Sequence, residues 1–464
     1  MADKGVTMES GGITAKNLIV TGGSGDIGSA AKNLNTNLSG TLDARTSGNL
    51  YLHQTGLDGN AAQVLTIQSV GGNLISLASD AGMQMTTEEG KNMGTIDGQN
   101  INLTSANGAL GLSTDGLRIA NSGGVLNASA ATDGQGIYLA GIGSGSLVLN
   151  QVTAGGDLSI DSKGSIQLGQ EAVEATDTTA AVDAIDSTVK ADNITLTAAG
   201  FINLAQGELQ AGAYDAAGKL LANTGSVNLN SSGVITQTSN HGILANTMNL
   251  VAAAGINMPS NVQGEAEDSR INALDTINIT NTDKTKDVYV ENKNNKNVTV
   301  NFAEGSTGTN VNINNHADDK QTSNLTVTGN GNAVQDMVIN NASGNVHAEG
   351  TLTAGRNLSI TAATSITNDK AVTATSGAIS LTAQNGITQT GAITAGTSLT
   401  VASETEGNLT FTGNIESGTA ASLKAKKGTN RPSVRRWWQT TYRRTTAAIN
   451  SEAGPITIYA TPSL

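Results

Sequence analysis

Pairs of apolar residues separated by one polar residue return at a regular interval along this chain. Alternation with a period of two, bounded by glycine, predicts a short strand with one buried face. The pairs recur about every 20 residues, and a fixed period of this length predicts stacked repeats rather than a compact domain. In the most regular stretch, residues 350–423, the pairs are Leu358 with Ile360, Ile379 with Leu381, and Leu399 with Val401.

The same pattern extends over most of the chain with less regular spacing. Between 277 and 339 asparagine becomes dense and the pairs lie about 13 residues apart. This closer spacing predicts that more than one face of each coil is marked by apolar pairs. Asparagines at the turns of successive coils are expected to form hydrogen-bonded ladders. Other pairs are Leu50/Leu52, Ile101/Leu103, Leu147/Leu149, Leu158/Ile160, Ile194/Leu196, Val227/Leu229, Val298/Val300 and Leu325/Val327.

Two stretches interrupt the pattern. Residues 171–191 are rich in Ala, Asp and Glu, and residues 259–273 begin at Pro259 and are rich in charge. We interpret both as insertions that project from the repeat. Residues 1–423 are therefore predicted to form one repeat shaft with insertions near 171–191 and 259–273.

The last 41 residues, 424–464, differ in every compositional respect. Eight of the 25 basic residues lie between Lys424 and Arg444 with no acidic residue among them, and both tryptophans, Trp437 and Trp438, are there. The remainder is strongly acidic, since residues 1–423 have a formal charge of −20 from 17 basic and 37 acidic residues. We interpret 424–464 as a basic tail that does not match the repeat, with out-of-frame translation as one explanation. Docking on an anionic surface is the alternative.

Composition agrees with a narrow, stacked fold. The 464 residues include 56 Gly, 4 Pro and no Cys, and only 11 are aromatic (3 Phe, 6 Tyr, 2 Trp). Most globular cores need large aromatic side chains to fill the space between layers. A β-solenoid has an interior that small aliphatic residues fill in layers. The sequence therefore predicts an all-β solenoid, and about 420 residues at about 21 per coil correspond to about 20 coils.

The net charge of the chain and the length of its apolar runs limit the partners that it could bind. The formal net charge of −13 disfavours nucleic acid, because binding to phosphates requires a basic face. No apolar run approaches the length of a transmembrane helix, so no transmembrane segment is expected. The first residues contain no apolar signal-peptide region, so we expect an exported chain of this kind to be an internal segment of a larger protein.

One segment imitates a dinucleotide-binding fingerprint. Residues 18–28 place Gly23, Gly25 and Gly28 in a Gly-x-Gly-x-x-Gly pattern after an apolar run, and this resembles extended short-chain dehydrogenases. That family pairs a Tyr with a Lys four residues later, a spacing that Tyr289 and Lys293 share. However, residues 29–40 lack the periodicity of the helix that should follow. We therefore predict no nucleotide cofactor.

Other candidate chemistry is equally sparse. Carboxylates gather in loop-like stretches, where they would bind calcium only if they converged. The histidines are scattered without metal-ligand spacing. We therefore nominate no catalytic, cofactor-binding or metal-binding residue, although residues one coil apart become neighbours in a solenoid. The residues concerned are the carboxylates Glu88, Glu89, Glu265, Glu267, Asp268, Asp318 and Asp319, and the histidines His53, His241, His316 and His347.

Asn-x-Ser/Thr sequons are frequent, and several coincide with the strand pattern. An asparagine in a turn before an apolar–polar pair creates a sequon automatically, so these matches are weak evidence for glycosylation. Examples are the sequons at Asn102, Asn193, Asn278, Asn297, Asn324, Asn357 and Asn408.

The repeat style resembles a known family of bacterial exoproteins. The segments Gly377-Ala-Ile-Ser-Leu-Thr-Ala-Gln-Asn-Gly-Ile-Thr-Gln-Thr-Gly and Gly225-Ser-Val-Asn-Leu-Asn-Ser-Ser-Gly-Val-Ile-Thr-Gln-Thr are similar to the shafts of filamentous haemagglutinin-type adhesins. This resemblance covers roughly residues 10–423 and implies a right-handed parallel β-helix that is secreted by the two-partner route. It also implies an outer-membrane translocator partner. The Asn-Pro-Asn motif of the family's secretion domain is absent, so the resemblance is to the shaft alone.

These observations together predict the structural shaft of a secreted or surface-exposed bacterial adhesin. Such a segment would hold a binding region away from the cell and would contact an unidentified glycan or protein receptor, without enzymatic activity. A β-helical polysaccharide lyase or hydrolase, the stick of a contact-dependent toxin, and an ice-binding solenoid are the alternatives. The last requires Thr-x-Thr at the same place in every coil, and Thr195/Thr197, Thr326/Thr328 and Thr410/Thr412 satisfy this only locally.

Overall fold

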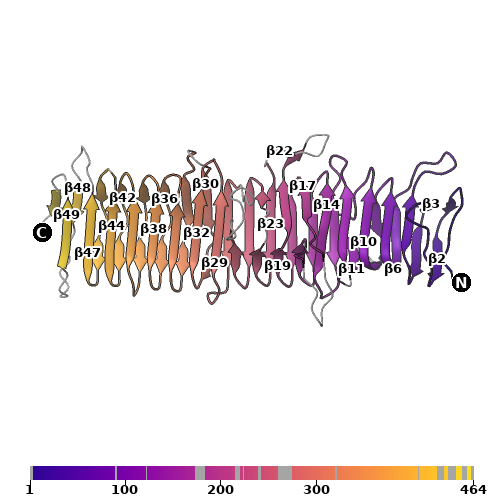
Figure 1. Ribbon diagram of the computed structural model, residues 1–464, viewed down its shortest axis with the longest axis horizontal. Helices are drawn as coiled ribbons and strands as arrows, with labels where there is room; N and C mark the ends of the chain where they lie inside the picture. Colours follow the sequence, from indigo (N-terminus) through magenta and orange to yellow (C-terminus); the bar gives the residue numbers. More distant parts are fainter. Residues whose placement is uncertain are drawn as a thin grey trace. The chain divides into compact units, whose positions relative to one another are not determined.

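All regular elements in the described part of the chain are β-strands, and no helix occurs there (Figure 1). The computed structural model describes residues 4–464 except 89–90, 93, 122, 173–182, 215–219, 223, 239–241, 260–273, 319–320, 406, 426–432, 437–445, 452–456 and 461–464. The chain divides into two units, residues 1–246 and 247–464. The main sheets of both units are parallel, which confirms the predicted β-solenoid.

The described part of unit 1 contains 25 strands, most of which pair in parallel with strands of the preceding and following turns. Two short antiparallel pairs, β8–β9 and β21–β22, are exceptions. The strands are β1 (Ile13–Ala15), β2 (Leu18–Gly23), β3 (Leu34–Leu38), β4 (Thr41–Thr46), β5 (Leu50–Gln54), β6 (Leu65–Ser79), β7 (Met83–Met85), β8 (Thr87–Glu88), β9 (Lys91–Asn92), β10 (Thr95–Ser105), β11 (Leu117–Asn121), β12 (Val125–Ala130), β13 (Ile137–Gly141), β14 (Leu147–Ala154), β15 (Leu158–Ser162), β16 (Ile166–Leu168), β17 (Ser187–Ala191), β18 (Ile194–Ala198), β19 (Ile202–Leu204), β20 (Gly207–Ala211), β21 (Ala213–Tyr214), β22 (Leu220–Ala222), β23 (Ser226–Ser231), β24 (Ile235–Gln237) and β25 (Ile243–Leu244).

The core of unit 1 consists of columns of aliphatic side chains, one from each turn. In-register pairing places the same inward position of successive turns directly above one another, so each side chain packs on the next. Every member of the column that starts at Leu52 is at most 3% exposed. That column runs Leu52, Leu77, Leu103, Ala128, Val152, Val189, Leu209 and Ile243.

Unit 2 contains the remaining described strands, which form three faces, and the third face extends only from β31 to β46. One face is β31, β34, β37, β40, β43 and β46, and the two others belong to the main sheet. The strands are β26 (Thr247–Ala252), β27 (Ile256–Met258), β28 (Thr276–Asn281), β29 (Val288–Lys293), β30 (Val298–Phe302), β31 (Thr307–Gly308), β32 (Val311–His316), β33 (Leu325–Gly329), β34 (Gly331–Ala333), β35 (Met337–Asn341), β36 (Val346–Ala348), β37 (Leu352–Ala354), β38 (Leu358–Ala362), β39 (Ile366–Asn368), β40 (Val372–Ala374), β41 (Ile379–Ala383), β42 (Ile387–Gln389), β43 (Ile393–Ala395), β44 (Ser398–Ser403), β45 (Leu409–Phe411), β46 (Ile415–Ser417), β47 (Ala420–Ala425), β48 (Ser433–Arg436), β49 (Thr446–Ser451) and β50 (Thr457–Ala460).

The apolar pairs that define the repeat stack as predicted. Leu358 pairs with Ile379 and Ile379 with Leu399, and all three are at most 1% exposed. The closer spacing between 277 and 339 also has the predicted cause, because two faces alternate there. The strand β30 pairs with β33 on one face, and β32 pairs with β35 on the other.

The expected number of coils was too high. The solenoid has about 16 turns rather than 20. A turn of about 21 residues holds for Leu358 and Ile379, but Leu158 pairs with Ile194, 36 positions later, and Ile194 with Val227, 33 positions later. Turn length varies because loops between strands lengthen without changing the register of the strands themselves.

A ladder of asparagines runs through the interior of unit 2. Asn292, Asn315 and Asn341 occupy one inward position of three successive turns and are at most 2% exposed. The Asn292 Nδ2 donates to the Asn315 Oδ1 at 3.1 Å, and the Asn315 Nδ2 donates to the Asn341 Oδ1 at 3.2 Å. Each amide thereby satisfies the next, which is the condition for burying polar groups without a large free-energy cost.

A second kind of ladder joins the turns at the surface. The side-chain oxygen of Asp287 accepts the backbone N–H of Asn310 at 3.1 Å, and the Asn310 oxygen accepts that of Asp336 at 3.3 Å. Asp336 accepts the N–H of Asn357 at 3.1 Å, and Asn357 accepts that of Ala378 at 3.0 Å. The predicted stacking of turn asparagines is therefore confirmed, and it explains why Asn is abundant where strands begin.

The predicted insertions lie largely outside the described residues, which omit 173–182 and 260–273. Residues 187–191 within the first predicted insertion form β17, which pairs with β14 and β20. In the basic tail, β48 pairs with β45, β49 with β47, and β50 with β48. Trp437 and Trp438 are outside the described residues, so the interpretation of the tail stays a prediction.

We predict that Asn315→Ala destabilises unit 2 strongly. The substitution removes the hydrogen bond that Asn292 donates to Asn315 and the one that Asn341 accepts from it, and it opens a cavity. The free energy of unfolding should therefore fall by about 2–4 kcal/mol. Urea denaturation followed by circular dichroism measures this change. The matched control is Asn312→Ala on the outward side of the same strand, with an expected effect within about 0.5 kcal/mol. Equal effects of the two substitutions would contradict a stabilising role of the ladder.

Candidate functional site

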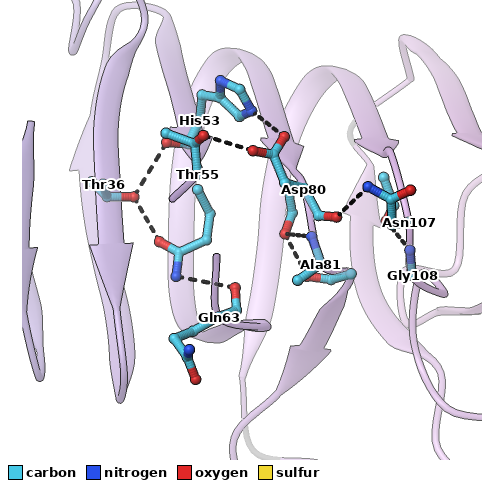
Figure 2. A network of polar contacts seen from close by, with 12 residues as sticks. Thr36, His53, Thr55, Gln63, Asp80, Ala81, Asn107 and Gly108 are labelled. Carbon is cyan, nitrogen blue, oxygen red and sulfur yellow. Dashed lines mark hydrogen bonds and ion pairs between the residues drawn. The ribbon is translucent and has the colours of Figure 1, made fainter. Parts of the chain in front are cut away.

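The outward faces of the sheets bring titratable side chains of neighbouring turns together. His53 on β5 lies 2.8 Å from the carboxylate of Asp80, measured from Nε2 to Oδ1. The Thr55 hydroxyl donates to the other carboxylate oxygen at 2.6 Å (Figure 2). The hydrogen bond from Thr55, followed by His53, lowers the pKa of Asp80 below its usual value, although partial burial opposes this shift. Asp80 is therefore ionised at neutral pH and connects two turns.

His347 has a similar arrangement in unit 2. Its Nε2 lies 2.8 Å from Asp369 of the next turn, and its Nδ1 lies 3.6 Å from Glu349 on the same turn. The three side chains are 38–49% exposed, so solvent screens their interaction. Both ring nitrogens face carboxylates, which leaves the imidazole no nitrogen for a substrate.

A larger titratable cluster lies on the outer face of β29 and β32. Tyr289, Glu291 and Lys293 alternate along β29, and His316 and Asp318 belong to the adjacent turn. The Tyr289 hydroxyl donates to Glu291 at 3.1 Å, and Glu291 lies 3.5 Å from the His316 Nε2. The Lys293 Nζ lies 2.9 Å from Asp318, and the Lys293 side chain is only 12% exposed.

Burial is the main cause of the pKa shifts of two groups in this cluster. It raises the pKa of Tyr289 to about 12, with the Glu291 carboxylate adding to the shift, so the phenol keeps its proton. Burial lowers the pKa of His316 below 6.5, against the attraction of Glu291, so the imidazole is neutral at pH 7. The hydrogen bond from Lys293, followed by that from Asn295, lowers the pKa of Asp318. The cluster thus combines a neutral imidazole, an ionised carboxylate and a paired ammonium, and most of these interactions join neighbouring turns.

Sequence reasoning missed these pairs because their members are far apart in the chain. The separations are 27 residues for His53 and Asp80, 25 for Glu291 and His316, and 22 for His347 and Asp369. Such pairs can be recognised in the sequence only when the number of residues in each turn is known. His241 lies outside the described residues.

The dinucleotide-like glycines serve close packing between turns. Gly28 has a φ of +69°, and a Cβ there would lie 2.3 Å from the Tyr51 carbonyl oxygen. A Cβ on Gly25 would lie 2.3 Å from the backbone nitrogen of Gly5. The Gly28 N–H, which a phosphate would need, donates to the Val6 carbonyl at 2.8 Å. No helix follows among the described residues, so the local structure does not form a phosphate-binding turn.

The carboxylates considered for calcium do not form a described ligand set. Asp318 binds Lys293 and Asn295 instead. The side chains of Glu88, Glu89, Glu265, Glu267, Asp268 and Asp319 lie outside the described residues. Among the residues that are described, no group of three or more His, Asp or Glu side chains is placed to hold a metal ion.

Most sequon asparagines participate in the ladders. Asn193 donates to Asp157 at 2.9 Å and accepts the N–H of Ser226 at 3.0 Å. Asn357 similarly bridges Asp336 and Ala378. The side-chain oxygens of Asn102, Asn278, Asn297 and Asn324 also accept hydrogen bonds from a neighbouring turn. A structural role therefore accounts for the recurrence of these asparagines, and glycosylation at any of them stays untested.

Comparison with known proteins identifies no relative. The chain matches no protein-family model, no curated protein and no solved structure. The resemblance to filamentous haemagglutinin-type shafts therefore stays a prediction. In the described residues, no helix has the length and apolar character needed to cross a bilayer.

We predict that Asp80→Asn removes part of the acid sensitivity of unit 1. The lowered pKa of Asp80 means that its contribution to stability is complete above the usual value for Asp, about 4, and is lost as the pH falls through the folded-state value. The variant should be less stable than the wild type at pH 7, and this difference should shrink below pH about 4. Thermal unfolding at a series of pH values measures both effects. Asp58→Asn is the control, because Asp58 lies in an exposed turn and asparagine tolerates its φ of 53°. This variant should change neither the stability at pH 7 nor its dependence on pH.

Proposed function

We propose that this chain is the structural shaft of a secreted or surface-exposed bacterial adhesin. The observation that supports this proposal is the series of in-register columns, in which each turn adds one layer to a narrow aliphatic core. Such a repeat allows extension by addition of turns, because each turn contacts chiefly its neighbours. A shaft of this type holds a binding region at a distance and offers contacts along its sides.

The surface agrees with this proposal in chemical character. Outward positions of the strands carry mainly Thr, Ser and Asn, as in Ser359, Ser380 and Thr400, which are in register on β38, β41 and β44. The acidic charge of the chain favours solubility and weak non-specific association. Export through an outer-membrane translocator partner is part of the same proposal, and it is based on the repeat resemblance alone.

The test is attachment of beads that carry the purified chain to epithelial cell monolayers. We expect several times more bound beads than with albumin-coated beads, and competition by an excess of the soluble chain. Attachment equal to the albumin control, or attachment that the soluble chain does not reduce, would contradict an adhesive function. The acidic surface makes albumin a suitable control, because albumin is also anionic.

Cleavage of a polysaccharide is a second candidate function, which the cluster around Lys293 favours. Carboxylates, an imidazole, a phenol and an ammonium group from neighbouring turns meet there, and these are the groups that acid–base catalysis uses. However, most of these groups are already paired within the cluster. Two hollows of the described surface are lined by residues of unit 1, and neither lining includes a residue of this cluster.

An assay for new reducing ends distinguishes the two functions, because hydrolysis and elimination both create one for each bond that breaks. With pectin, alginate, hyaluronan and chitin as substrates, we expect no increase above the buffer control. An increase that Lys293→Met and Glu291→Gln both abolish, while folding is retained by circular dichroism, would establish the enzymatic alternative.

A further inference from the structure

A gap in one outward column of unit 1 separates a cation from an anion. The column runs Thr21, Arg45, Gly71, Asp97 and Ala120 on β2, β4, β6, β10 and β11, paired in register. Because adjacent strands are about 4.8 Å apart, the backbones at Arg45 and Asp97 are separated by about 10 Å. Gly71 between them contributes no side chain.

The fold does not require glycine at position 71. Its φ lies outside the left-handed region, and a Cβ built there would approach no atom more closely than 3.9 Å, the distance to the Asp97 carbonyl oxygen. This contrasts with Gly28 and Gly25, where backbone packing leaves no room for a Cβ. A Cβ at 71 would therefore meet no close contact, and the glycine keeps the surface between Arg45 and Asp97 open.

The gap belongs to a hollow of about 590 Å³ whose lining is entirely polar or glycine. Its volume falls within the range of small-molecule sites, about 300–1,000 Å³. Arg45, Asp97, Asn73, Gln99 and Thr46 supply hydrogen-bonding groups, and Gly71 is also part of the lining. Arg45 also borders a second hollow of about 540 Å³ that includes Gln68 and Thr86. The two hollows thus adjoin along the same face.

Arg45 is oriented by neighbours rather than free to fill the gap. Its Nε lies 3.4 Å from Asp43 on the same strand, and its Nη2 donates to the Ser69 hydroxyl of the next turn. The side chain remains 63% exposed. The guanidinium therefore keeps donors available at one wall of the hollow, and Asp97, which is exposed, offers acceptors two turns away.

The chemistry of the lining selects the ligand class. No apolar side chain lines the hollow, which disfavours lipids and apolar small molecules, and the carboxylate of Asp97 disfavours phosphates and polyanions. A single carboxylate near a guanidinium is also a poor cation site. The guanidinium, carboxylate and amide groups of the lining are planar and can donate and accept hydrogen bonds. Such groups, spread over a shallow surface, suit the vicinal hydroxyls of a saccharide.

We propose that this hollow binds one or two residues of a neutral oligosaccharide. In this arrangement Asp97 accepts hydrogen bonds from the saccharide's hydroxyls, and Arg45 donates hydrogen bonds to its hydroxyl or ring oxygens. The inference rests on the proposed adhesive function and names the class of receptor for it. Without an aromatic platform the single-site affinity should be weak, with a Kd on the order of 1 mM, and many copies on one surface would raise the effective affinity.

Saturation-transfer NMR of the full chain tests this proposal, with maltotriose, cellotriose, N-acetyllactosamine and chitotriose as neutral probes and sialyllactose as an acidic one. We expect at least one neutral probe to bind and Gly71→Val to weaken that binding at least tenfold. Arg45→Gln and Asp97→Asn should weaken it as well. Gly145→Val is the matched control, because a Cβ at Gly145 has no atom within 4 Å and so, like one at Gly71, meets no close contact; this variant should bind as the wild type does.

Each outcome decides one question. Failure of all neutral probes to bind, or equal binding by Gly71→Val, would overturn the saccharide site even if beads attach to cells, in which case the adhesive function stands without it. Exclusive binding of sialyllactose would replace the neutral class by an acidic one. Saccharide binding that depends on Gly71, in a chain whose beads do not attach, supports the site and contradicts the adhesive function.

Discussion

In-register hydrogen bonding between parallel strands of successive turns is the constraint on which the rest of the structure depends. A shift by one residue would turn every buried side chain of a strand outward, so register and core are specified together. Leu358, Ile379 and Leu399 illustrate this relation, since each is almost fully buried only because it lies above its predecessor. The same alignment places like side chains together on the outer face, and ladders follow from it.

The ladders explain how a chain with few aromatic residues specifies a single register. Aliphatic columns alone would tolerate slippage between equivalent turns, because one Leu or Ile packs on another nearly as well. The buried amides of Asn292, Asn315 and Asn341 permit one alignment, since any other would leave their donors and acceptors unsatisfied. Polar residues in this core therefore contribute specificity in addition to stability, as buried polar positions do in coiled coils.

The sequence predicts the fold better than it predicts surface chemistry, and the reason is physical. Burial requires apolar residues at alternate positions, so Ile379 and Leu381 reveal their strand wherever they occur. The number of turns was overestimated because loop length is not constrained by register, as the 36 residues between Leu158 and Ile194 demonstrate. Contacts such as that between His53 and Asp80 depend on the length of one particular turn, so they were not predictable before that length was known.

The surface features differ in how well the fold accounts for them. The glycines at 25 and 28 and the turn asparagines have immediate structural causes, namely close backbone packing and satisfaction of N–H groups in the next turn. The cluster on β29 and β32 is internally paired and joins two turns. Gly71 differs from these glycines, because neither backbone conformation nor close packing requires it. What distinguishes Gly71 is its place between the cation Arg45 and the anion Asp97 in one column, and this placement is the reason to assign a ligand-binding role to the opening.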